Sequence, residues 1–228
     1  MSELSLAVIV QMRLDSSRLP RKALLPLGFG TVASAVLERL RHIPADHYIL
    51  ACDPASQPEL AAIATAAGFR LHVGPKDDVL GRFCGAIETW RPTYIVRATG
   101  DNPFVSAELA TRLLDYARPL GLDYAGYQGL PLGMGVEVVK AAALLVANRS
   151  AASLYDREHV CPYLYQHPDL FQIERPACPA AWQLPASRLT IDTAADYALA
   201  QQLVAALGEQ PTDASILAWL KAGLGSGS

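Results

Sequence analysis

Residues 6–11, LAVIVQ, form a short and almost wholly apolar run that leads directly into a polar stretch, MRLDSSRLPRK, at 12–22. Such a run is typical of a strand that is buried on both faces of a sheet. Three more strand-like runs follow at 47–52, 70–73 and 94–99, and helix-like segments precede them at 31–43, 57–68 and 78–90. This alternation predicts an α/β fold whose central, mostly parallel sheet is covered on both faces.

The second half of the chain is less regular. Helical spacing of apolar residues predicts helices at 107–117, 141–148, 156–166, 194–207 and 214–222. Shorter apolar runs predict strands that begin at Tyr124 and that cover 135–139, 171–174 and 188–192. Asp77 or Asp78 is expected to cap the helix at 78–90, because aspartate side chains accept hydrogen bonds from the first turn of a helix.

The composition disfavours several classes of protein. The 228 residues are 51% hydrophobic and carry a net charge of −3, so there is no basic excess for binding nucleic acid. No apolar stretch approaches the roughly 20 residues that span a bilayer, and the first residues lack the features of a signal peptide. The cysteines are far apart and predict neither a zinc site nor a disulfide framework. We therefore expect a cytoplasmic protein with no membrane or nucleic-acid partner.

The loop after the first strand concentrates positive charge. Four cations lie within ten residues, together with two serines: Arg13, Ser16, Ser17, Arg18, Arg21 and Lys22. A triphosphate suits such a loop, because guanidinium groups bind phosphate oxygens in a fork and lysine adds a point charge. A solvated basic loop on the surface is the alternative. The glycine patterns of P-loop ATPases and of Rossmann dehydrogenases are absent from the sequence.

Several motifs in this chain resemble those of one enzyme family. The stretch QMRLDSSRLPRK at 11–22 resembles the opening motif of the CMP-sugar synthetases, and most closely that of the SpsF-like cytidylyltransferases of spore-coat polysaccharide synthesis. Further matches follow in the family's order at 77–83 (DDVLGRF), 97–103 (RATGDNP), 135–138 (GVEV), 157–163 (REHVCPY) and 189–193 (LTIDT). Together they cover residues 6 to about 200.

The resemblance implies a fold and a division of the chain. The fold would be the three-layer αβα arrangement of nucleotide-diphospho-sugar transferases. Residues 1–222 would form one nucleotidyltransferase domain, with a nucleotide-binding half at 1–105 and an acceptor-binding half at 106–222 that could also form a homodimer. Residues 223–228 end in GSGS, which is typical of a flexible tail.

The resemblance also implies roles for individual residues. Arg13, Ser17, Arg18 and Lys22 would hold the triphosphate of CTP, and Asp101 and Asp192 would bind Mg²⁺. Arg13, Lys22 and Asp101 would carry the chemistry. The remaining nucleotide contacts would come from Asp78, Arg82 and Arg97, and the acceptor contacts from Glu137, Arg157, Glu158 and His159.

Several of these roles have a structural alternative. Asp101 lies in a good turn sequence, GDNP, and Asp192 precedes a helix that it could cap. Asp78 and Arg82 are spaced to pair along a helix. Arg97 interrupts an apolar strand, and since a buried cation without a partner is costly, we expect it to point toward an anion or a carboxylate near the site.

The implied reaction is attack by an acceptor oxygen on the α-phosphorus of CTP, with release of pyrophosphate. The acceptor would be an acidic sugar, a phosphate or a phosphonate; Gly135 stands where the family usually has an acidic residue, which leaves the acceptor open. One rival is a non-catalytic nucleotide- or sugar-binding module. Another is a nucleotide-sugar-dependent glycosyltransferase, although its usual D-x-D motif is not found in GDNP.

Overall fold

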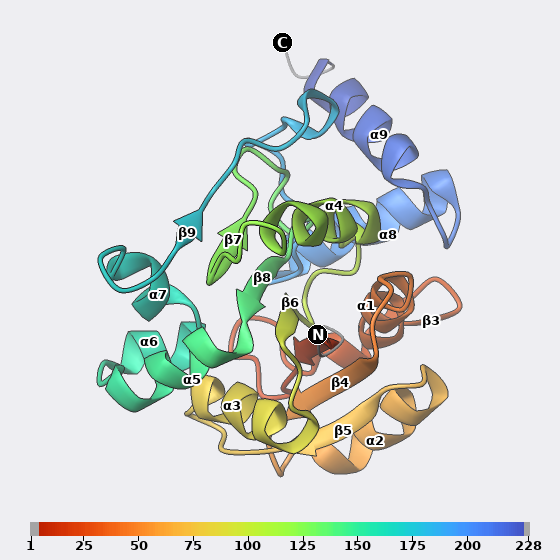
Figure 1. The fold of residues 1–228 in the computed structure, drawn as a ribbon. Coiled ribbons are helices and arrows are strands. Elements are labelled where there is room, and N and C mark those ends of the chain that lie inside the picture. Colours follow the sequence, from red (N-terminus) through yellow and green to blue (C-terminus); the bar gives the residue numbers. More distant parts are fainter. Residues whose placement is uncertain (1–4, 226–228) are drawn as a thin grey trace.

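The computed structural model describes residues 5–225 and has a seven-stranded sheet at its centre (Figure 1). The strand order is β5-β4-β1-β6-β8-β7-β9. The first four strands in this order are parallel to one another, β8 is antiparallel to both β6 and β7, and β7 and β9 are parallel. Their bounds are β1 Leu6–Gln11, β4 His47–Cys52, β5 Arg70–Val73, β6 Tyr94–Thr99, β7 Tyr124–Gly126, β8 Glu137–Lys140 and β9 Ile173–Glu174.

Helices cover both faces of this sheet, which confirms the three-layer αβα arrangement. Alternate residues of β1 point into two different cores: Val8 and Val10 pack with one set of helices, and Ala7 and Ile9 with another. The first core contains residues of α1 (Val32–Leu40), α2 (Gln57–Ala66) and α4 (Ala107–Ala117). The second contains residues of α3 (Val79–Trp90), α5 (Ala141–Ser150) and α7 (Pro162–Gln166), and α6 (Leu154–His159) lies beside them.

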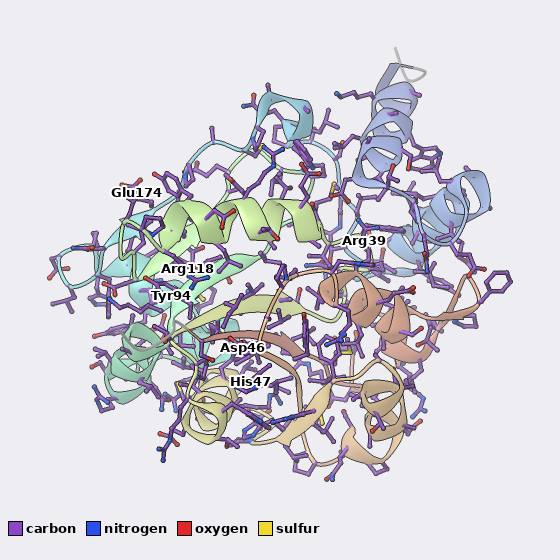
Figure 2. The ribbon with its side chains drawn as sticks, turned by 45° about the vertical axis from the view of Figure 1, so that its right-hand side comes forward. Arg39, Asp46, His47, Tyr94, Arg118 and Glu174 are labelled. Carbon is purple, nitrogen blue, oxygen red and sulfur yellow. The ribbon has the colours of Figure 1, made fainter. Side chains whose placement is uncertain are left out.

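A third core joins the end of the chain to its beginning. Helices α8 (Ala194–Leu207) and α9 (Asp213–Gly225) pack with the hairpin of β2 (Pro26–Leu27) and β3 (Gly30–Thr31) and with the start of α1. Arg39 strengthens this junction, because it donates to the carbonyl oxygens of Val105 (2.7 Å) and Pro211 (2.9 Å) and pairs with Asp213 (Figure 2). The C-terminal helices are thus an integral part of the fold.

Polar side chains set the starts of several helices. Asp78 caps α3 by accepting a hydrogen bond from the Gly81 amide at 2.8 Å. Asp78 is one of the two residues, Asp77 and Asp78, that were expected to cap this helix. Thr193 and Asp196 form a reciprocal capping box at the start of α8. Because Thr193, the N-cap of α8, directly follows Asp192, this cap also fixes the position of a predicted metal ligand.

Three sequence predictions differ from the structure. The strand expected at 188–192 is wrong: only Arg188 forms an isolated bridge, with Leu132, because this segment bonds to loops instead of a strand. The helix expected at 156–166 is divided into α6 and α7 at Val160, whose φ is 75°. Helix α9 continues to Gly225, and the remaining tail residues, 226–228, lie outside the described residues.

No helix within residues 5–225 is both long enough and apolar enough to cross a membrane.

Candidate active site

A polar pocket of about 340 Å³ opens where β1 and β6 end. These two strands are neighbours in the sheet, with Gln11 beside Thr99, so the loops that follow them meet. Residues far apart in the sequence line this pocket, which we call the nucleotide pocket: Gln11, Met12, Arg13, Ser16, Ser17, Arg18, Lys22, Ala23, Val79, Arg82, Arg97, Thr99, Gly100, Asp101, Glu158, His159 and Asp192. Most of the residues predicted for the nucleotide and the metal are therefore brought together.

Lys22 lies at the centre of the charged groups in this pocket. Its ammonium donates hydrogen bonds to Asp101 Oδ2 at 3.0 Å, to Asp192 Oδ1 at 2.9 Å and to the Ile191 carbonyl oxygen at 2.7 Å. It begins the short 3₁₀ helix η1 (Lys22–Leu24), just after Arg21, which has a left-handed backbone (φ 56°). The cluster therefore joins the loop after β1, the loop after β6 and the segment before α8.

Close backbone contacts hold the two aspartates at this point. A side chain at Gly100 would come within 3.0 Å of the Gln11 carbonyl oxygen, so glycine lets the loop after β6 approach β1. The Ile191 amide donates to the Asp101 carbonyl oxygen at 2.8 Å, which links the two aspartate-bearing segments directly. Asp101 and Asp192 consequently direct carboxylate oxygens at one nitrogen atom.

Two arginines add positive charge around Asp192. Arg18 reaches Oδ1 at 3.0 Å, and Arg188 reaches Oδ2 at 2.5 Å and Asp196 at 3.1 Å. Burial would raise the pKa of Asp192, but the hydrogen bond from Lys22 and the charges of Lys22 and Arg18 hold that pKa below its usual value. Asp192 is therefore an anion at neutral pH, as a metal ligand must be.

The donor set at this cluster suits a hard divalent cation. Two carboxylate oxygens converge on one position, and Mg²⁺ is commonly bound by one or two carboxylates together with phosphate oxygens and water. Among the described residues, no group of three or more His, Cys, Asp and Glu side chains is placed to bind a metal. With two aspartates as protein ligands, the remaining coordination positions of such an ion would be filled by phosphate oxygens and water.

Arg82 lines the nucleotide pocket from helix α3. It is only 1% exposed, its Nη1 donates to the Pro75 carbonyl oxygen at 3.2 Å, and its Nε is buried without a hydrogen-bond partner. Burial lowers the pKa of this guanidinium, while the nearby Asp53 raises it. A buried donor with spare hydrogen-bonding capacity is suited to an acceptor group of a ligand.

A tight turn places Glu158 and His159 over the same pocket. Val160 has φ 75° and ψ −57°, and the Cys161 amide donates to the His159 carbonyl oxygen at 2.9 Å. This is a γ-turn, a strained conformation for a β-branched residue. Glu158 faces Arg13 at 3.5 Å, a partly exposed and therefore weak pair. Although they are predicted for the acceptor, Glu158 and His159 line the nucleotide pocket.

A second pocket of about 280 Å³ adjoins the first, and we call it the inner pocket. The two pockets share Arg97 and Thr99. A loop with several glycines forms much of its wall; the complete lining is Arg97, Ala98, Thr99, Asn102, Tyr124, Gly126, Tyr127, Gly129, Leu130, Pro131, Leu132, Gly133, Gly135, Val136, Glu137 and Arg175. Glu137, predicted to contact the acceptor, lies in this pocket.

Glu137 is already held by neighbouring donors. Its Oε2 accepts from Arg97 at 2.7 Å, and its Oε1 accepts from the Tyr124 hydroxyl at 2.8 Å. Burial would lower the pKa of Arg97, but the Glu137 carboxylate raises it above its ordinary value. The expectation that Arg97 points toward a carboxylate near the site is confirmed. Burial and the charge of Glu137 also raise the pKa of Tyr124.

Arg157 is not among the residues that line either pocket. Its guanidinium pairs with Asp78 at 2.5 Å and donates to the carbonyl and side-chain oxygens of Asn148 at 2.9 and 2.8 Å. These contacts join α6 to the start of α3 and to α5. Neither Arg157 nor Asp78 lines the nucleotide pocket or the inner pocket, so their predicted contacts with acceptor and nucleotide stay predictions.

Sequence reasoning assigned no role to several polar residues of the site, among them Arg188, Tyr124 and Arg175. Arg188 lies four residues before Asp192, and this spacing is the only local signal for their contact. Tyr124 and Arg175 come from β7 and the segment after β9 and meet only in the folded chain, where Arg175 lies 6.0 Å from the ring centre of Tyr124. No sequence pattern marks either of them.

Comparison with known proteins gives consistent matches. The chain is 36% identical to the spore coat polysaccharide biosynthesis protein SpsF of Bacillus subtilis (strain 168) over 211 residues, which cover 89% of this chain and 88% of that protein. A cytidylyltransferase from Leptospira borgpetersenii superposes with a TM-score of 0.88 at 24% identity, covering 98% of this chain and 96% of the other.

More distant solved structures share the fold and contain ligands. A CMP:2-keto-3-deoxy-manno-octonic acid synthetase in complex with CTP has a TM-score of 0.67 at 14% identity, over 89% of this chain and 99% of its own. The manganese complex of Rv0371C from Mycobacterium tuberculosis H37Rv has a TM-score of 0.60 at 20% identity. The match covers 88% of this chain and 99% of that one. The cytidylyltransferase family model matches residues 7–217, and this chain belongs to the cytidylyltransferase family.

Proposed function

We propose that this enzyme transfers CMP from CTP to a small anionic acceptor, with release of pyrophosphate and with Mg²⁺ as cofactor. The main support for this proposal is the cluster of Lys22 with Asp101 and Asp192. This cluster lies in the nucleotide pocket, which directly adjoins the inner pocket. A nucleotidyl transfer needs two substrates held side by side with a cation near the reacting phosphate. The acceptor would be an acidic sugar, a phosphate or a phosphonate.

The two pockets would divide the substrates between them. In the nucleotide pocket Arg13, Ser17 and Arg18 would hold the triphosphate, and the buried Arg82 would contact a polar edge of the base. The acceptor would enter the inner pocket, where Glu137 is fixed by Arg97 and could accept a hydrogen bond from an acceptor hydroxyl. Arg97 and Thr99 belong to both pockets, so the reacting atoms would meet beside them.

The residues of this chain would contribute positioning and charge neutralisation. When bound to Asp101 and Asp192, the metal would supply Lewis-acid stabilisation of the charge on the phosphate. Lys22 and the arginines would bind the non-bridging oxygens and the departing pyrophosphate. No side chain would need to form a covalent bond, because the acceptor oxygen itself is the nucleophile.

The test is pyrophosphate release measured with each of the four nucleoside triphosphates, Mg²⁺ and a panel of acidic sugars, sugar phosphates and phosphonates, with neutral sugars as controls. We expect release only with CTP and an anionic acceptor. Activity with another nucleotide would change the assignment of the base. A protein that binds CTP but releases no pyrophosphate with any acceptor would be a binding module, and consumption of a nucleotide sugar would identify a glycosyltransferase.

We also propose, from the family resemblance, that the enzyme is a cytoplasmic homodimer whose second half, 106–222, forms the interface. Light scattering measures the mass in solution, and a mass of about one chain at micromolar concentration would contradict the dimer. Fractionation of cells tests the location.

A further inference from the structure

The hydrogen bonds of Lys22 account for every donor that its ammonium group has. The three acceptors are Asp101 Oδ2 at 3.0 Å, Asp192 Oδ1 at 2.9 Å and the Ile191 carbonyl oxygen at 2.7 Å. An ammonium group has three N–H donors, and the side chain is only 14% exposed. Lys22 is therefore a fully satisfied and largely buried cation that can leave this position only for a place that offers several new acceptors.

The same carboxylate oxygens are the ones proposed to bind the metal. Mg²⁺ binds oxygen at roughly 2.0–2.1 Å, so an ion held by both aspartates would occupy the space of the Lys22 nitrogen. Arg18 and Arg188 already bring further positive charge to Asp192. A divalent ion and the Lys22 ammonium therefore compete for one position.

A nucleoside triphosphate would resolve this competition. Its phosphates would lie among Arg13, Ser17 and Arg18 in the same pocket, and a polyanion offers enough oxygens to satisfy three N–H donors. The flexible stem of a lysine lets its ammonium move between neighbouring acceptors. The incoming nucleotide would also bring the negative charge that a divalent ion needs.

We propose that Lys22 occupies the metal position until the phosphates of the nucleotide draw its ammonium away, so that metal and nucleotide enter together. This inference rests on the proposed function and adds a form of regulation to the same site. Metal binding and nucleotide binding are then positively coupled, and the coupling acts equally in both directions. Lys22 serves first as an internal substitute for the metal and then as a phosphate ligand.

Binding of Mn²⁺ tests this inference without any acceptor. The free Mn²⁺ signal in electron paramagnetic resonance is titrated against the full chain and against Lys22→Met, which removes the charge and keeps the length of the stem. Without nucleotide, we expect Lys22→Met to bind Mn²⁺ at least about tenfold more tightly than the unaltered protein. With CTP, corrected for Mn²⁺ bound by CTP alone, the unaltered protein should gain much more affinity than the variant.

Three further variants make the result specific. Arg18→Met removes another cation from Asp192 but none from Asp101, and its side chain is 63% exposed, so its Mn²⁺ affinity should change less than about threefold. Lys22→Arg keeps the charge and should still bind Mn²⁺ weakly. Adding Asp101→Asn to Lys22→Met should remove the gained affinity, which locates the ion. Circular dichroism verifies that each variant is folded.

Equal or weaker Mn²⁺ binding by a folded Lys22→Met protein would overturn the inference. The inference would also be overturned if Lys22→Met keeps its increased Mn²⁺ affinity after Asp101→Asn is added, because the ion would then lie elsewhere. If neither the unaltered protein nor any folded variant binds Mn²⁺ even with CTP, the proposal of a divalent metal at this site is wrong. Both the cofactor in the proposed function and the inference about Lys22 are then contradicted. A failure confined to the comparison of Lys22 variants leaves the proposed transfer intact.

Discussion

The nucleotide pocket and the inner pocket meet at Arg97 and Thr99 but balance their charges differently. In the nucleotide pocket, cations surround Asp101 and Asp192, and several of them lie on a partly exposed loop. In the inner pocket, Arg97 of β6 and Glu137 of β8 neutralise each other. The first arrangement can exchange its internal ion pairs for those of a polyanion, whereas the second is a fixed surface against which a smaller molecule would be positioned.

The largest effect is expected at the nucleotide pocket. Asp101→Asn keeps the size of the side chain but removes one of the two carboxylates at the Lys22 cluster. We expect kcat to fall by roughly 100-fold or more, the scale of several kcal/mol of lost charge stabilisation. Steady-state pyrophosphate release measures this, and the melting temperature is the control. If the variant keeps a kcat within a few-fold of the unaltered protein, Asp101 is not a residue of the active site.

The inner pocket should respond to Glu137→Gln in a different way. Arg97 would lose its charged partner while buried, so both stability and acceptor binding should suffer. We expect the acceptor KM to rise roughly 10- to 150-fold, the loss of one charge-assisted hydrogen bond, with little change in the KM for CTP. Tyr124→Phe is the matched control, since it removes one neutral donor from the same carboxylate. Equal increases in both KM values would mean that the pockets do not divide the substrates.

Arg157→Ala decides between the family resemblance and the observed contacts. If Arg157 binds the acceptor, the acceptor KM rises on the same scale as for Glu137→Gln. The contacts with Asp78 and Asn148 instead favour a structural role, in which both KM values stay within about twofold and the melting temperature falls by a few degrees. Kinetics and thermal unfolding of the same sample separate the two outcomes.

The smallest effect concerns stability and pH. The folded protein holds the pKa of Asp192 below its usual value, so this carboxylate stabilises the fold at a pH above its unfolded pKa. That contribution is lost as the pH falls through the lowered folded value. We expect the difference in unfolding free energy between the unaltered protein and Asp192→Asn to shrink below about pH 4. A difference that stays constant from pH 7 to pH 3, measured by urea unfolding, contradicts this.

The parallel part of the fold was predictable in detail. The strands β1, β4, β5 and β6 have the expected bounds. Strands β1, β4 and β6 are mostly apolar runs that end in polar loops, whereas β5 alternates between polar and apolar residues. The carboxyl ends of these four strands form one edge of the sheet, so the loops at 13–22 and 100–103 were expected at that edge. They meet because β1 and β6 are neighbours, which the sequence did not predict. The contact between Arg97 and a carboxylate also followed from the cost of burying a lone cation.

Other parts depend on contacts that local sequence does not encode. The segment at 188–192 has the apolar character of a strand, yet its backbone bonds to Leu132 and Asp101, and Gly133 (φ 102°) approaches Thr190 too closely for any side chain. The turn at Val160 rotates Glu158 and His159 toward the nucleotide pocket. Pro162 is the one local sign of a break in the expected helix, because proline is tolerated in the first turn of a helix but not in its interior, and α7 begins at this residue.

The link between Lys22 and Asp192 also sets the order in which a newly made chain can become active. Lys22 belongs to the loop after the first strand, whereas Asp192 is held by the cap of α8, and α8 and α9 are secured to α1 through Arg39. During synthesis, the loop after β1 would emerge well before the last helices. A chain interrupted before residue 192 would have strands and cations but no complete cluster, so the charge arrangement of the site can form only after the segment before α8 has been made.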